Sequence, residues 1–200
     1  MTLINISEPE RPLLHGFALF RLGFRPFFLL GSLWGLLVLG YFILLISGMA
    51  TELPSRWDMV EWHRHEMLFG FVGAIVAGFL LTAVPNWTGL PTVKGSRLAA
   101  LTGLWCAGRA CVFMSAKLPE TLVMVLDASF FVGCALAIAP ALIRSNNKRN
   151  YGFIALLLLL ALASGLTHGE YADAGIRLGL GVVGARVAPG GAAIDSRHQW

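Results

Sequence analysis

Residues 26–50, PFFLLGSLWGLLVLGYFILLISGMA, contain no Asp, Glu, Lys or Arg, and this stretch decides the fold class. At ~1.5 Å per residue, an apolar helix of about 20 residues crosses the ~30 Å hydrocarbon layer of a bilayer. The stretch lacks the alternation of polar and apolar residues that is typical of a strand. Because lipid offers no partner to an unpaired backbone group, we predict that these residues form a membrane-spanning helix.

The same pattern recurs along the chain and predicts an all-α, polytopic bundle of transmembrane helices. After Pro26–Ala50 come the apolar segments Met67–Val93, Leu98–Ala116, Thr121–Ile143 and Tyr151–Thr167, and a glycine-rich candidate, Ala174–Ile194. We expect five clear helices and a weak sixth, because two arginines interrupt the last candidate. Residues 1–183 are expected to form the helical domain, and residues 184–200 form an atypical tail.

The composition excludes several classes of protein. Hydrophobic residues make up 56% of the 200 residues and charged residues only 13%, whereas soluble domains carry about 25% charged residues. An ordinary soluble enzyme, a disordered chain and a disulfide-stapled secreted domain are therefore excluded. The net charge of +4 is not gathered into a basic run, so we expect the lipid bilayer, and no nucleic acid, as a partner.

The distribution of Lys and Arg predicts the orientation. Most of the basic residues that flank the predicted helices fall on the side that carries the N-terminus, and the opposite side holds most of the acidic ones. Because cytoplasmic loops carry an excess of Lys and Arg, we expect a cytoplasmic N-terminus and an external loop over residues 51–64.

The densest group of metal-ligand side chains is WHRHEM, residues 62–67. Neutral imidazole suits haem iron, copper and zinc, and a methionine thioether suits copper(I) or haem iron. On a regular helix His63 and Met67 share a face, whereas His63 and His65 point roughly 200° apart and cannot bind the same ion. The alternative interpretation is an amphipathic helix start without a ligand, with Trp62 anchored at the membrane surface.

The predicted topology places polar residues that are far apart in the sequence at a similar depth in the membrane. His63, His65, Arg109, Asp127 and His168 all fall in the external half of the bundle. A charge inside the membrane costs at least ~2.5–3.5 kcal/mol, so we expect Arg109 and Asp127 to face inward as a pair. Alternatively, Arg109 binds an anionic group such as a haem propionate. His168 is a candidate second metal ligand or a plain helix-end histidine, and His15 lies at the opposite surface.

Two classes of function follow from these residues. In the first, the external half binds haem or copper through His63 or His65, with His168 as the second ligand. In the second, the chain is half of a transporter or channel that pairs as a homodimer, with Arg109 and Asp127 lining its pathway. We find no residue pattern that identifies a catalytic reaction.

Several ordered motifs resemble the NnrS family: FRPFFLL at 24–30, WHRHEMLFGF at 62–71, AGFLLTAVPNWTG at 77–89, AGR at 107–109 and DASFF at 127–131. The resemblance implies a multi-pass protein of the bacterial inner membrane that contains haem and copper. It also implies a role in the response to nitric oxide and nitrosative stress, often near denitrification functions. The candidate positions that match the family are His15, His63, His65, Arg109, Asp127 and His168, with Met67 inside the second motif.

Family members are about twice as long as this chain, which implies that residues 1–183 correspond to the N-terminal half of an NnrS-like bundle. Residues 184–189 look like a damaged form of a later family motif. A truncated or frame-shifted, non-functional fragment is therefore a third expectation beside the two classes of function.

Overall fold

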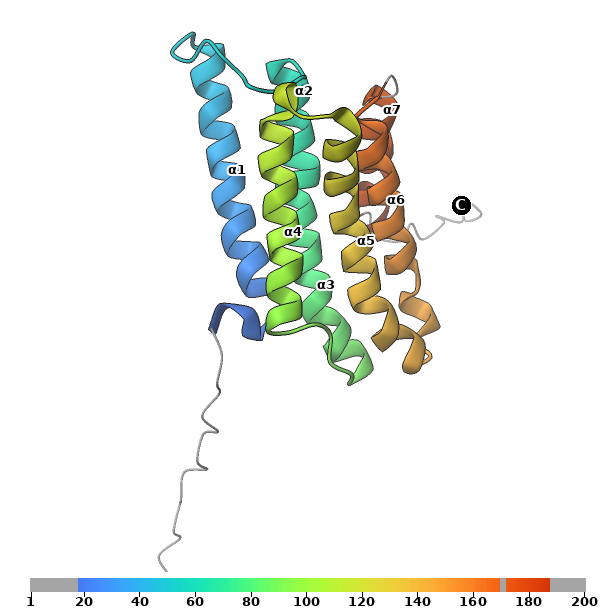
Figure 1. The fold of residues 1–200 in the computed structure, drawn as a ribbon. Coiled ribbons are helices and arrows are strands. Elements are labelled where there is room, and N and C mark those ends of the chain that lie inside the picture. The colour runs from blue at the N-terminus through green and yellow to red at the C-terminus, as the bar shows by residue number, and fades with distance from the viewer. Residues whose placement is uncertain (1–17, 170–171, 188–200) are drawn as a thin grey trace, which may run out of the picture.

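The computed structural model describes residues 18–169 and 172–187, and every regular element in these ranges is a helix (Figure 1). The principal helices are α1 (Phe24–Ile46), α2 (Met59–His65), a π-helical segment (Glu66–Val72), α3 (Gly73–Thr88), α4 (Ser96–Phe113), α5 (Glu120–Arg144), α6 (Gly152–Leu166) and α7 (Ala172–Val187). Short 3-10 turns occur at Ala18–Arg21, Ser115–Lys117 and Lys148–Asn150. The predicted all-helical class is confirmed.

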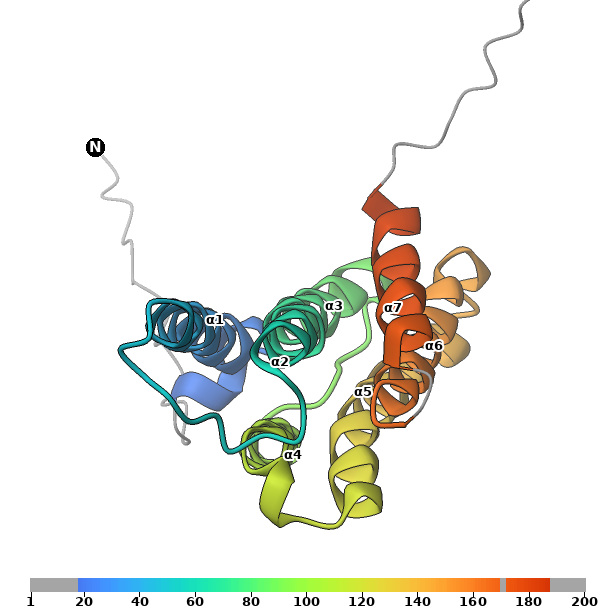
Figure 2. The same cartoon turned by 90° about the horizontal axis from the view of Figure 1, so that it is seen from above.

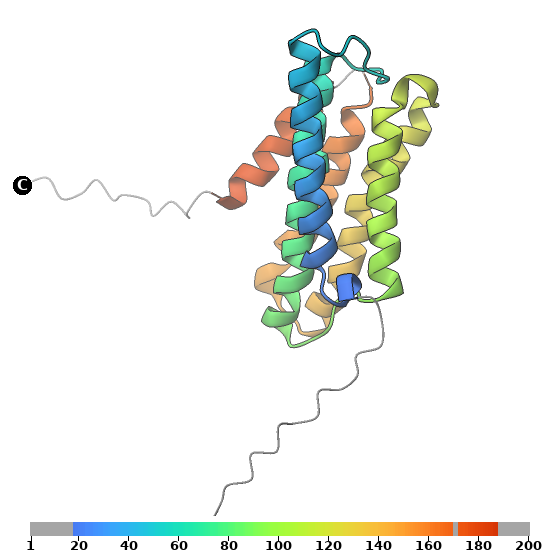
Figure 3. The same cartoon turned by 90° about the vertical axis from the view of Figure 1, so that its left-hand side faces the viewer.

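The helices α3 and α5 lie at the centre of the bundle (Figure 2). α1 packs against α3 on one side, α4 packs against α5, and α6 and then α7 complete the other side. The long helices run up and down in alternation, so the end of α1, the start of α2, the end of α4, the start of α5 and the end of α6 meet at one end (Figure 1). We call it the α2 end. Helix α7 is inclined to its neighbours (Figure 3).

Four helices are long and apolar enough to span a membrane: Phe24–Ile46, Met59–Thr88, Glu120–Arg144 and Lys148–Leu166. Helix α4 is not among them, although Leu98–Ala116 had been counted with the five clear helices. It carries Arg97 and Arg109 within its 18 residues, which lowers its apolar character. The predicted count of five is therefore not confirmed, and the cytoplasmic orientation of the N-terminus stays a prediction.

The second long helix differs most from its predicted bounds. It was expected over Met67–Val93, but it runs continuously over Met59–Thr88. It begins early because the carboxylate of Asp58 accepts hydrogen bonds from the backbone N–H groups of Val60 and Glu61, at 2.7 and 2.9 Å, and so caps the first turn. It ends at Gly89, whose φ of +69° is the left-handed conformation that glycine adopts at helix ends.

The packing of α1 on the long helix depends on close approach. A Cβ atom on Gly31 would lie 2.9 Å from the Cβ of Ala74, so the two helices meet at small residues. The outer face of α1 is apolar and exposed, as expected of a helix that faces lipid; it includes Leu29, Leu33 and Leu36. Interior space at the α2 end is instead filled by polar side chains, which form the candidate site.

Candidate metal site

The long helix changes its winding where it enters the bundle. Residues Glu66–Val72 are π-helical, a rare geometry that is often found at functional sites. As a result two consecutive polar residues are buried, His65 with 1% and Glu66 with 0% of their surface exposed. Gly70 makes room for them, since a Cβ there would lie 2.6 Å from Oε2 of Glu66.

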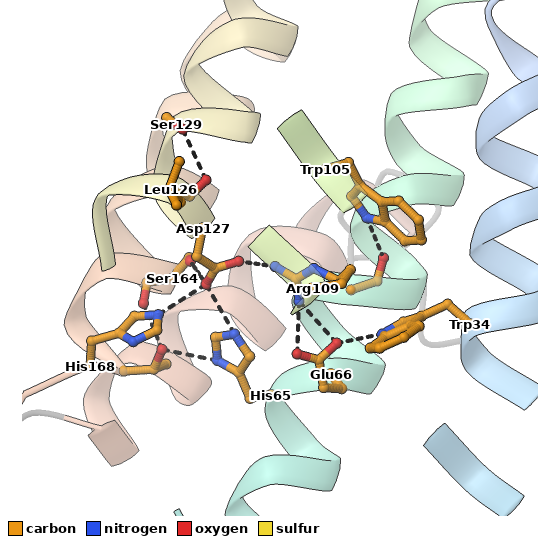
Figure 4. Close-up of polar contacts among 12 residues, drawn as sticks. Trp34, His65, Glu66, Trp105, Arg109, Leu126, Asp127, Ser129, Ser164 and His168 are labelled. Carbon is orange, nitrogen blue, oxygen red and sulfur yellow. Dashed lines mark hydrogen bonds and ion pairs between the residues drawn. The ribbon is translucent and has the colours of Figure 1, made fainter. Parts of the chain in front are cut away.

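Arg109 of α4 joins two buried carboxylates (Figure 4). Its Nη1 donates to Oε1 and Oε2 of Glu66 at 3.1 and 3.0 Å, and its Nη2 donates to Oδ1 of Asp127 on α5. Trp34 of α1 donates its indole N–H to Oε2 of Glu66 at 2.5 Å. The guanidinium therefore ties together the long helix, α4 and α5.

The second oxygen of Asp127 faces a different set of groups. Oδ2 accepts a hydrogen bond from the hydroxyl of Ser164 at 2.5 Å. It also accepts a hydrogen bond from Nε2 of His168 at 3.0 Å, and it lies 3.0 Å from Nε2 of His65. The ligand atoms of His65, Asp127 and His168 all lie within 4.8 Å of one another, and all three residues are buried. Two imidazoles and a carboxylate at this spacing form a candidate metal site.

The hydrogen bonds of Thr167 fix the tautomer of His65. The Thr167 hydroxyl lies 2.6 Å from the carbonyl oxygen of Ser164 and 3.0 Å from Nδ1 of His65. A carbonyl can only accept, so the single hydroxyl hydrogen goes to Ser164 and the proton on the histidine side must sit on Nδ1. In the neutral imidazole, Nε2 then carries a lone pair.

That lone pair of His65 faces the wrong partner for a hydrogen bond. Nε2 is buried and makes no hydrogen bond with a described residue, although a carboxylate oxygen of Asp127 lies 3.0 Å away. Two electron-rich atoms at this distance repel each other unless a cation stands beside them. The orphaned nitrogen therefore fits a bound metal ion, which would accept electron density from both atoms.

His168 lies beyond the last residue of α6 and is kept neutral by its surroundings. Burial, followed by the nearby charge of Arg109, lowers the pKa of His168 to about 4. At neutral pH its ring is therefore uncharged, which is the form that binds metals.

The space around the histidines suits a bare ion. The Trp57 ring covers both imidazoles, with centroid distances of 4.5 Å to His65 and 4.9 Å to His168. The cleft beside His65 measures about 10 Å³; it is lined by Trp57, Glu61, Arg64, His65, Thr167 and Ile176. A volume of about 10–15 Å³ holds a single water. The ring centroids of His65 and His168 lie only 5.4 Å apart, so a haem macrocycle does not fit between these two histidines.

Four of the predicted residues come together here: His65, Arg109, Asp127 and His168. His63 does not join them; it points away and stacks on Phe42, with 4.1 Å between ring centroids. Met67 packs on an apolar cluster that includes Val38 and Trp62. His15 lies outside the described residues. The Nη atoms of Arg109 bind Glu66 and Asp127, and its Nε makes no hydrogen bond with a described residue, so the expected contact with a haem propionate stays a prediction.

The sequence analysis missed Glu66, Trp34, Ser164 and Thr167. Glu66 lies in the WHRHEM group but was given no role there. Its position directly before a long apolar run was a usable signal, because a carboxylate that is buried needs a cationic partner. Trp34, Ser164 and Thr167 gave no such signal, since these residue types are common in membrane helices for other reasons.

Comparison with known proteins identifies the family. A profile described as NnrS protein matches residues 18–189. No curated protein and no solved structure matches the chain. The matched range includes His65, Glu66, Arg109, Asp127, Ser164, Thr167 and His168. Because the match extends over most of the 200 residues, the chain belongs to the NnrS family.

Proposed function

We propose that the chain is a membrane protein of the nitric-oxide response that holds a bare transition-metal ion, copper by preference, between His65, His168 and Asp127. The observation that carries the proposal is the lone pair of His65 Nε2, which is buried beside a carboxylate oxygen without a hydrogen to share. Membership of the NnrS family supports the link to nitric oxide.

Each residue has a separate task in this proposal. Two imidazoles and one carboxylate bind the ion, and Thr167 holds the ring of His65 in the binding tautomer. Ser164 and Arg109 orient the carboxylate of Asp127. Such supporting hydrogen bonds raise metal affinity by about 10–100-fold. When bound, the ion would supply Lewis-acid and redox chemistry toward a small molecule such as nitric oxide.

The charges of the cluster favour a cation. Glu66 and Asp127 face one guanidinium in a region where isolated charges are costly. A metal ion adds positive charge beside Asp127, where the imidazoles are neutral. Imidazole and carboxylate ligands suit copper and also non-haem iron(II), and the family favours copper. The haem that the family implies is not assigned to His65 and His168, because the space between them does not hold it.

Metal analysis of purified variants tests the proposal. The full chain would be purified in detergent, stripped of metal, loaded separately with copper or iron(II), and analysed for metal per chain. His65→Ala and His168→Ala should each lower the metal content severely, and the matched control His63→Ala should retain it. Full retention of metal in both His65→Ala and His168→Ala would remove the proposal. A chain that binds iron(II) but not copper would change the assignment of the ion.

The proposal also covers the membrane in which the chain lies and the orientation of its helices. We propose an inner-membrane location with a cytoplasmic N-terminus, which predicts that a reporter fused after Ser55 is external and one fused after Asn147 is cytoplasmic. The alternative of a half-transporter receives less support. Arg109 and Asp127 are tied to buried partners on several helices, an arrangement that favours a fixed site over a path for moving charges.

A further inference from the structure

The three ligand residues of the candidate metal site are closed off from solvent. His65 is 1% exposed, Asp127 0% and His168 6%. The cleft beside His65 reaches the surface at the exposed residue Arg64, but it measures only about 10 Å³. This space is close to that of a single water, so an ion with its hydration shell does not pass. An ion therefore enters or leaves only when a group that covers the site moves.

Trp57 covers the site from a segment that can move. Its ring packs on the imidazoles of both His65 and His168, and it forms one wall of the cleft. Phe69 also packs on His65, at 4.9 Å between ring centroids, but Phe69 is buried within the π-helical segment. Trp57 is half-buried and belongs to the irregular connection between α1 and α2. Its displacement would uncover both histidines without unwinding a helix.

The connection that carries Trp57 is fastened to another part of the chain. It does not run straight from α1 to α2 but swings out to α4 first (Figure 2). There residues 54–57, which we call the lid, meet residues 115–118, the turn between α4 and α5. The backbone N–H of Arg56 donates to Oγ of Ser115 at 2.9 Å, and the hydroxyl of Ser55 forms a hydrogen bond with the same oxygen at 3.1 Å.

Further hydrogen bonds hold the lid to the turn. Nη2 of Arg56 donates to the carbonyl oxygens of Ser115 and Leu118, at 3.3 and 2.9 Å. The backbone N–H of Ala116 donates to the carbonyl oxygen of Pro54 at 3.3 Å. Ser115 is only 3% exposed, so its bonds are shielded from water. The lid is therefore held closed by bonds that involve none of the three metal-ligand residues.

We propose that residues 54–57 are a lid that controls access to His65 and His168, and that the hydrogen bonds to Ser115 determine how often it opens. The lid rests on the proposed function in one respect, since the metal ion is what it admits and releases. It acts on rates and not on affinity. A lid that opens more often speeds entry and exit by the same factor, so the ratio of the two rates stays constant.

Metal-exchange rates test the lid. The full chain in detergent would be loaded with copper, and the rates of loading and of release to an excess of chelator would be measured. Ser115→Ala removes two hydrogen bonds of the lid without a change of charge, and it should raise both rates about tenfold. The affinity should not change. Ser47→Ala is the matched control, because that exposed hydroxyl bonds only to the Leu44 carbonyl of its own helix, and it should alter neither rate.

Two further variants guard against a Ser115→Ala chain that does not fold. Arg56→Met removes the side-chain bonds from an exposed position and should also raise both rates. Trp57→Ala removes the cover itself and should raise both rates at least as far as Ser115→Ala. Helix content and elution volume of each variant verify that it is folded.

A second measurement needs no metal. Diethyl pyrocarbonate acylates the neutral imidazole of an accessible histidine, and mass spectrometry of peptides gives the rate at each position. In the metal-free Ser115→Ala chain, His65 and His168 should react about tenfold faster than in the wild type, in proportion to the opening of the lid. His63 lies outside the site, stacked on Phe42, and should react at an unchanged rate.

Unchanged exchange rates in a folded Ser115→Ala chain would overturn the proposal, and so would unchanged modification of His65 and His168. Faster release with unchanged loading would also overturn it, because that pattern means weaker support of the bound ion and not a lower barrier to its passage. A wild-type chain that binds no copper would instead remove the metal from the proposed function. The modification rates would then decide on the lid alone, so the two failures are distinguishable.

Discussion

Two buried carboxylates share Arg109, and their surroundings differ in kind. Glu66 receives hydrogen bonds from Arg109 and Trp34, so each described group around it has a hydrogen to give. Asp127 receives hydrogen bonds from Arg109, Ser164 and His168, but it also faces His65, whose nearest nitrogen makes none. The comparison separates a buried carboxylate whose described neighbours all donate to it from one that also faces a nitrogen without a hydrogen bond, and only the second is proposed as a metal ligand.

The largest effect is expected when both carboxylates lose their shared partner. Arg109→Met should lower the free energy of unfolding by about 3–5 kcal/mol, because it leaves two uncompensated buried charges. Unfolding in detergent, followed by circular dichroism, measures the change. Arg97→Met on the same helix is the control and should stay within about 0.5 kcal/mol, because Arg97 is exposed. Equal stability of the two variants would contradict the assigned role of Arg109.

Replacing each carboxylate by its amide tests the roles of Asp127 and Glu66 separately. Asp127→Asn should weaken metal binding about 100-fold, since a charged ligand is lost and the carboxamide must also replace the acceptor for Ser164. Glu66→Gln should keep metal affinity within a few-fold but lower stability by about 1–3 kcal/mol. Metal titration and unfolding of both variants measure the contrast. If Glu66→Gln loses the metal as fully as Asp127→Asn, the division into anchor and ligand is wrong.

The substitution Gly70→Ala adds a methyl group beside Glu66 and so tests Glu66 separately from Asp127. Gly70→Ala would bring a Cβ to 2.6 Å from Oε2 of Glu66 and 3.1 Å from Nη1 of Arg109. We expect a loss of about 1–3 kcal/mol in stability from this overpacking, with metal still bound. Gly103→Ala on α4 meets no described atom within 4 Å and should be neutral or slightly stabilising. The same unfolding assay compares the two variants.

The smallest effect is expected from the hydrogen bond that fixes the tautomer. Thr167→Val keeps the shape but removes the acceptor at Nδ1 of His65, and should weaken metal binding about tenfold. Ser129→Ala is a matched control, because that hydroxyl bonds only to the Leu126 carbonyl of its own helix (Figure 4). Metal titrations of both variants provide the test. A Thr167→Val protein with unchanged affinity would remove the argument from the tautomer.

The pattern of charges in the sequence predicted much of the fold. Helices α1 and α5 begin and end within four residues of Pro26–Ala50 and Thr121–Ile143, because uncharged apolar runs define such helices directly. The start of α2 could not be predicted in the same way. Its cap, Asp58, stands in a polar stretch, and charged residues and histidines interrupt the apolar residues of the helix that follows, MVEWHRH.

The site was predictable only in part, for a geometric reason. Intramembrane charges single out Arg109 and Asp127, and topology brings His168 to the same depth. The choice between His63 and His65 depends on the rotation of the helix, which composition does not determine. The π-helical segment after His65 leaves no mark in the residue pattern, so the burial of Glu66 beside His65 could be found only in the structure.

The π-helical segment also determines which changes in length the chain tolerates. Substitutions at its half-buried positions, such as Phe71 or Val72, keep the number of residues between His65 and Gly78 and so keep both ends of the long helix in register. A π-turn holds about one residue more than an α-turn, so the loss of one residue is taken up when the segment relaxes to an α-helix. The gain of one residue meets no such slack and rotates everything before it by about 100° relative to α3. His65 and Glu66 would leave their partners together. The segment Glu66–Val72 is therefore expected to tolerate a shortening by one residue better than a lengthening by one.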